Sequence, residues 1–185
     1  MISTNDFRTG ITIVVDGQLW TVVDFQHVKP GKGSAFVRSR LKNVLRGNTL
    51  EKTFRAGEML PRAIIETREM QFLYSSGDEY HFMDNSNYEQ IVLGHDALGD
   101  GVDLLKEGMT IDVKFYEGRV IGAELPNHVE IKVVQTNPGY RGDTATNVTK
   151  PAKVETGATI QVPLFINQGD TIRIDTRDRK YISRV

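Results

Sequence analysis

The sequence predicts an all-β protein built from three small β-barrel domains, and two observations support this. Short runs rich in β-branched and aromatic residues follow one another along the 185 residues, separated by turn sequences that contain Gly, Asn or Asp. The formal net charge also changes in blocks, with +5 over residues 1–63, −9 over residues 64–127 and +3 over residues 128–185. We therefore expect three domains with these limits.

The composition excludes several classes of protein. The chain contains no cysteine, so it forms neither a disulfide nor a thiolate metal site. No apolar run approaches the roughly 20 residues that a membrane-spanning helix needs. The first residues also lack the basic region and apolar core of a signal peptide. We expect a cytoplasmic monomer that has no membrane partner.

The first domain is expected to form an SH3-like barrel, because its predicted strands are short and closely spaced. Asp16-Gly17, between two of these strands, is a strong signal for a two-residue hairpin turn. A further turn is expected at Arg46-Gly47-Asn48. The predicted strands are 10–15, 19–28, 36–44 and 50–54.

The second and third domains each contain about five predicted strands, as an OB-type barrel requires. In the second domain, residues 96–107 also have the composition of a short helix, interrupted by Gly99 and Gly101. The third domain contains a glycine- and threonine-rich loop at 138–149. The predicted strands are 64–68, 70–75, 80–83, 88–93, 110–116 and 119–125 in the second domain, and 129–135, 152–155, 159–162, 171–175 and 181–184 in the third.

The segment between the strands 19–28 and 36–44 carries the main candidate site. Pro30 presets a turn-like φ, and Gly31 and Gly33 are expected to supply positive φ values. Lys32 would then lie at a tight, slim and exposed hairpin tip, where its ammonium group can enter a narrow space. A lysine at a hairpin tip is also common without any function.

The strand that follows this tip carries Arg38, Arg40 and Lys42 at alternate positions. Side chains with a period of two lie on one face of a strand, so these three cations are expected to share a face. A cationic face behind a cationic tip would suit RNA, although a solvated strand face is an equally good interpretation.

Catalytic and metal-binding patterns are weak. Gly31-Lys32-Gly33-Ser34 departs from the phosphate-binding Walker loop, since Gly33 separates the lysine from the serine and a predicted strand follows. The four histidines do not have the spacing of metal ligands. No nucleophile–base arrangement is visible. We therefore expect a protein that is not an enzyme and that has neither a cofactor nor a metal.

Several motifs then occur in one order along nearly the whole chain, and together they resemble the bacterial elongation factor P family. The combination of the first loop with the C-terminal pattern is the most specific part of this resemblance. The motifs are Lys29-Pro30-Gly31-Lys32-Gly33, Met70-Gln71-Phe72-Leu73-Tyr74, Glu124-Leu125-Pro126, Gly142-Asp143-Thr144-Ala145, Val162-Pro163-Leu164-Phe165 and Tyr181-Ile182-Ser183-Arg184-Val185.

The resemblance implies one SH3-like (KOW-type) and two OB-type domains in an L-shaped, tRNA-like arrangement. It implies a translation elongation factor that binds both ribosomal subunits between the peptidyl and exit sites and stimulates peptide-bond formation at consecutive prolines. Lys32, in the loop of Lys29, Pro30, Gly31 and Gly33, would position the acceptor end of the peptidyl-tRNA. In this family the tip lysine commonly carries a modification, so a modifying enzyme is a further expected partner.

The resemblance also indicates candidate RNA contacts in the third domain. Gly142, Asp143 and Thr144 match a loop that lies near the exit-site codon. Tyr181 and Arg184 match positions near the tRNA anticodon stem and ribosomal RNA. Lys150 is either an RNA contact or a solvated loop lysine.

Two other functions remain open from the sequence. A general RNA-binding or transcription-elongation adaptor can be built from the same barrels, although no strip of aromatic and basic residues for base stacking is apparent. An enzyme that uses Lys32 as a phosphate ligand is the second alternative.

Overall fold

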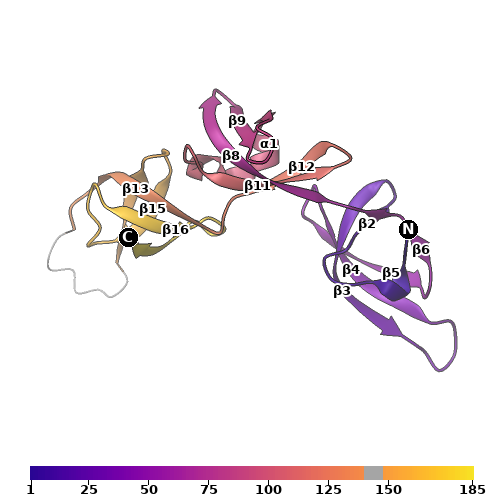
Figure 1. The fold of residues 1–185 in the computed structure, drawn as a ribbon. Coiled ribbons are helices and arrows are strands. Elements are labelled where there is room, and N and C mark those ends of the chain that lie inside the picture. The colour runs from indigo at the N-terminus through magenta and orange to yellow at the C-terminus, as the bar shows by residue number, and fades with distance from the viewer. Residues whose placement is uncertain (140–147) are drawn as a thin grey trace. The chain divides into compact units, whose positions relative to one another are not determined.

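The computed structural model describes residues 1–139 and 148–185, and within them the chain is nearly all β (Figure 1). These residues divide into two compact units. The first contains Met1–Thr67 and Lys114–Gly122, and the second contains Arg68–Val113 and Ala123–Val185. No helix of the described part is both long and apolar enough to cross a membrane.

The N-terminal sheet is an antiparallel meander in the order β5-β4-β3-β2-β7, and β1 pairs separately with β6. Its turn at Asp16-Gly17 is confirmed, since both residues have the positive φ values, 51° and 72°, of a hairpin turn. The elements are β1 (Ile2–Ser3), the 3-10 turn η1 (Thr4–Asp6), β2 (Thr12–Val15), β3 (Gln18–Val28), β4 (Phe36–Asn43), β5 (Thr49–Arg55), β6 (Met59–Leu60) and β7 (Arg62–Ala63).

The middle sheet has the order β10-β9-β8-β11-β12. The two strands predicted at 64–68 and 70–75 are in fact the single strand β8, because buried Met70 and Phe72 continue one alternating pattern. The predicted helix is only one α-helical turn followed by a 3-10 segment, and Gly99, with φ of 67°, ends the α-helical turn. The elements are β8 (Glu66–Ser76), β9 (Glu79–Asp84), β10 (Gln90–Leu93), α1 (His95–Leu98), η2 (Gly99–Leu104), β11 (Thr110–Tyr116) and β12 (Arg119–Glu124).

The C-terminal sheet has the order β15-β14-β13-β16-β17. In this sheet, as in the middle one, the first strand lies at the centre between the second and the fourth strands. The repeated order agrees with the prediction of two barrels of one type. The strands are β13 (His128–Thr136), β14 (Thr149–Val154), β15 (Thr159–Pro163), β16 (Thr171–Asp175) and β17 (Lys180–Arg184).

The buried side chains of the C-terminal sheet form one hydrophobic core, which also includes a residue of the 3-10 segment η2 in the second unit. Leu104 of η2 is fully buried in the same cluster as Ile131 and Ile172. Beside it, the Arg179 guanidinium forms hydrogen bonds with both carboxylate oxygens of Asp103. These contacts hold the turn between β16 and β17 in place.

Candidate functional site

The hairpin of β3 and β4 presents the loop 29–35, and Figure 1 shows it projecting from the N-terminal sheet. The last residue pair of the ladder is Val28 with Phe36, and β5 still supports β4 at this level because Arg55 pairs with Phe36. Lys29 through Ser34 are all exposed. A well-paired ribbon therefore carries an accessible loop at its end.

Within this loop, the two glycines differ in conformation. Gly33 has φ of +104°, as predicted, and an added Cβ would lie 3.9 Å from Cγ of Pro30. Gly31 does not adopt the left-handed region, so the prediction for that residue is wrong. The loop also bends over several residues and is not a tight turn. Only Gly33 is required by backbone geometry.

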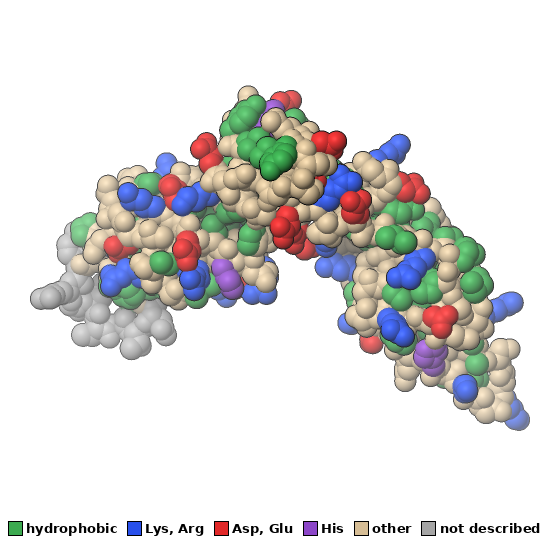
Figure 2. Space-filling model, in the orientation of Figure 1, with side chains coloured by type: hydrophobic (Ala, Val, Ile, Leu, Met, Phe, Trp, Pro, Cys, Tyr) green, Lys and Arg blue, Asp and Glu red, His purple; other side chains and the backbone are tan. Residues whose placement is uncertain are grey.

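The prediction that three cations share one exposed face of β4 is confirmed. Arg38, Arg40 and Lys42 are exposed, and the residues that alternate with them are buried: Val37, Ser39, Leu41 and Asn43. Figure 2 shows Lys and Arg side chains both on this sheet and at the end of the hairpin. The first unit therefore carries cations both in the hairpin loop and along the exposed face of β4.

The three cations of this face have different neighbours across the sheet. Arg40 lies opposite Asp24 on β3 and Glu51 on β5, so carboxylates flank it on both sides. Arg38 and Lys42 lie opposite neutral polar residues on both strands. An anion bound to this face would therefore be attracted more strongly by Arg38 and Lys42 than by Arg40.

Lys150 lies in the C-terminal sheet, where its exposed fraction is only 6%. Its Nζ donates a hydrogen bond to the backbone carbonyl of Asn137. It belongs to β14 and faces inward with Ala152 and Val154, so the interpretation as a solvated loop lysine is wrong. In this position it fixes the base of the loop between β13 and β14 and offers little charge to a partner.

The loop residues Gly142, Asp143 and Thr144 lie outside the described residues. The backbone just before them is closely packed, because a Cβ on Gly139 would lie 2.4 Å from the carbonyl oxygen of Leu164. Gly139 thus marks the start of the loop, and buried Lys150 marks its end.

Tyr181 and Arg184 both belong to β17, but their environments differ. Tyr181 is half-buried and packs against the core. The guanidinium carbon of Arg184 lies 5.5 Å from the centre of the Phe165 ring, and its Nη1 lies 3.9 Å from Oδ2 of Asp170. Phe165 is 58% exposed, so the fold creates an exposed pair of an aromatic ring and an arginine that the sequence did not reveal.

A strong local charge pair orders the turn before β17. Nε and Nη2 of Arg177 donate to the two carboxylate oxygens of Asp175, at 3.1 and 2.7 Å. These hydrogen bonds, with a further one from the Arg177 backbone, lower the pKa of Asp175 far below its usual value. The described residues hold no cluster of three potential metal ligands.

Comparison with solved structures defines the class of fold. The chain resembles eukaryotic translation initiation factor 5A from Methanococcus jannaschii, with a TM-score of 0.52 and 23% identity, over 66% of this chain and 94% of the other. A translation initiation factor 5A family protein from Naegleria fowleri gives a TM-score of 0.55 and 14% identity, over 67% and 96% of the two chains. About two thirds of this chain thus shares its fold with two proteins whose names describe them as translation initiation factors.

Sequence comparison gives the family. The chain is 60% identical to elongation factor P of Gloeobacter violaceus (100% of this chain, 99% of the relative) and 58% identical to that of Pelotomaculum thermopropionicum (100% of both). The family descriptions "Elongation factor P (EF-P) KOW-like domain", "Elongation factor P (EF-P) OB domain" and "Elongation factor P, C-terminal" match residues 3–60, 65–123 and 129–184. The chain belongs to the elongation factor P family, which consists of translation elongation factors and not of enzymes.

Proposed function

We propose that this elongation factor binds the ribosome between the peptidyl and exit sites and stimulates peptide-bond formation at consecutive prolines. Lys32 would position the acceptor end of the peptidyl-tRNA. The observation that carries the proposal is the exposed loop with Lys32 at the end of a paired hairpin, whose strand β4 also carries an exposed basic face.

Lys32 would act by positioning the reactants. Proline is a poor acceptor because its ring fixes φ and also restricts the preceding residue. Holding the two reactants in an attack-ready geometry lowers the barrier without new chemistry. A hundredfold rescue requires about 2.7 kcal/mol, which a few charge-assisted contacts can supply.

The same observations bear on the partners that we propose. Arg38 and Lys42 would contact RNA phosphates from β4, and Arg184 would contact ribosomal RNA or tRNA from β17. The contacts of Gly142, Asp143 and Thr144 remain proposals from the sequence. Lys32 is accessible to an enzyme that would extend its side chain, and such an extension would lengthen the reach of the loop.

The test is reconstituted translation of a message that encodes consecutive prolines, with a proline-free message as the control. Protein from the native host is compared with Lys32→Ala, and Lys29→Ala is the matched variant because Lys29 is exposed in the same loop. We expect Lys32→Ala to lose about a hundredfold in rate on the proline message alone. Equal activity of the two variants would disprove the positioning role of Lys32.

An RNA-binding adaptor is the second candidate, and the exposed Phe165–Arg184 pair favours it, since such pairs stack on bases. This function requires tight binding to free single-stranded RNA. Binding to ribosomes without measurable binding to a free 12-nucleotide RNA would exclude it.

A further inference from the structure

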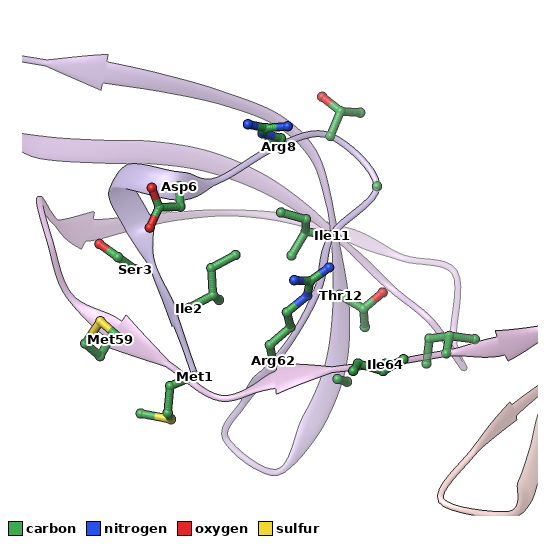
Figure 3. A pocket seen from close by; sticks show the side chains of 14 residues that line it. Met1, Ile2, Ser3, Asp6, Arg8, Ile11, Thr12, Met59, Arg62 and Ile64 are labelled. Carbon is green, nitrogen blue, oxygen red and sulfur yellow. The ribbon is translucent and has the colours of Figure 1, made fainter.

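A pocket of about 950 Å3 lies in the first unit, apart from the hairpin loop (Figure 3). The N-terminal segment forms one wall, and β2 and the segment β6–β7 form the other. Backbone hydrogen bonds hold the walls, from Thr4 N to Glu58 O and from Val14 N to Pro61 O, both 2.9 Å long. The pocket is therefore a preformed part of the barrel, with a volume typical of ligand sites.

Apolar side chains line this pocket and extend to its rim. Ile2 and Ile11 belong to the hydrophobic core beneath it. Ile64 and Met1, at 78% and 75%, are the two most exposed large hydrophobic side chains in the described part of the chain, and both line the pocket together with Met59. A concentration of exposed apolar groups around one hollow is typical of an interaction site.

Charged groups of both signs complete the pocket. Figure 3 shows Arg62 extending from β7 between Ile2 and Thr12, with Arg8 and Asp6 nearer the N-terminal wall. Among the described residues, neither guanidinium forms an ion pair with a carboxylate, and Asp6 forms none with a cation. Two arginines thus border an apolar surface without an internal partner for their charge.

We propose that this pocket binds an extended segment of another protein that carries a large apolar side chain beside an acidic one. Ile and Met side chains suit an apolar anchor, and the arginines suit a neighbouring carboxylate. RNA fits less well because none of the residues that line the pocket carries an aromatic ring for base stacking. The inference does not depend on the proposed action of Lys32.

The sheet adds a backbone argument for an extended segment. β7 is the last strand of its sheet, so its outer edge pairs with no strand of the described chain. An extended peptide can hydrogen-bond to such an edge while alternate side chains enter the pocket.

The test begins with selection from a random 12-residue peptide library displayed on phage, with the full chain immobilised. The selected peptide is then measured by fluorescence anisotropy against Arg62→Glu and Ile64→Glu. The matched controls are Arg46→Glu in an exposed turn of the same unit and Ile182→Glu on the exposed face of β17.

We expect enriched peptides that share an apolar residue next to Asp or Glu. Their affinity should fall at least tenfold in both pocket variants and less than twofold in both controls. No enrichment, enrichment of basic peptides, or equal losses in pocket and control variants would overturn the proposal. Two further outcomes would also overturn it. If a 12-nucleotide RNA binds more weakly to Arg62→Glu and is not displaced by the peptide, the pocket is an RNA site. If the chain self-associates and Ile64→Glu abolishes this, the pocket binds a second copy.

Discussion

Lys32 and Lys150 carry the same side chain, and the sequence suggests an RNA contact for each, but the fold gives them opposite environments. Lys32 is exposed in a loop that extends beyond the last pair of β3 and β4. Lys150 is buried in β14, and its ammonium group is bound to a backbone carbonyl of its own domain. The contrast shows that a lysine can bind a partner only when its ammonium group is exposed and is not already hydrogen-bonded within the fold.

The largest difference between the two lysines should be in stability. Lys150→Ala leaves a cavity in the C-terminal sheet and removes the donor to the carbonyl of Asn137 just beyond β13, which should lower the stability by about 3 kcal/mol. Lys150→Met keeps most of the volume and should lose less. Hydrogen exchange of the amides in β13–β15 measures this directly.

Two matched variants control that experiment. Lys153 lies on the opposite, exposed face of β14, so Lys153→Ala should change stability by less than about 0.5 kcal/mol. Lys32→Ala should leave the protection of every strand unchanged. If Lys150→Ala is as stable as Lys153→Ala, the structural role of Lys150 is wrong.

The second prediction concerns the backbone around Lys32. Gly33→Ala must place a Cβ in the left-handed region, at a cost of about 1–2 kcal/mol, and should displace the tip and reduce rescue of the proline message severalfold to tenfold. Gly31→Ala meets no atom within 4 Å and has no such strain, so its activity should be retained. Equal losses in the two variants would show that the loop conformation differs from the one described.

The third prediction separates the cations of the β4 face. Arg38→Ala and Lys42→Ala should each weaken ribosome binding by a factor of about 2–5 and reduce its salt dependence. Arg40→Ala should have less effect because Asp24 and Glu51 flank it. Binding titrations at two salt concentrations test this ranking, and a larger effect of Arg40→Ala would reverse it.

The fourth and smallest effect is a pH dependence of the C-terminal sheet. Hydrogen bonds from Arg177 lower the pKa of Asp175 below its ordinary value of 3.8. This carboxylate therefore stabilises the fold above that value, and the contribution is lost as the pH falls toward the folded-state pKa.

Asp175→Asn should accordingly flatten the loss of stability between neutral pH and pH 3, measured as melting temperature against pH. Asp112→Asn, on the exposed face of β11, is the control and should leave the profile unchanged. A profile that is as steep in Asp175→Asn as in the original chain would exclude this contribution.

Local sequence predicted the features that depend on local geometry. Asp16-Gly17 specified its turn because few other residue pairs adopt two successive positive φ values. Alternation predicted the face of Arg38, Arg40 and Lys42 because the period of a strand is two. The same alternation also contained a signal for Lys150, which precedes buried Ala152 and Val154 by two and four residues. That signal was missed because the predicted strand began only at residue 152.

The sequence alone determined most of the longer strands, several of their turns and the family, since these follow from local conformational preference and from motifs in a fixed order. Tertiary structure decided which of these residues can meet a partner. It buried Lys150, paired Phe165 with Arg184, and gathered Arg8, Arg62 and exposed Ile64 around one pocket. The physical reason is that exposure and contact depend on strand pairing between distant segments, which local patterns do not specify.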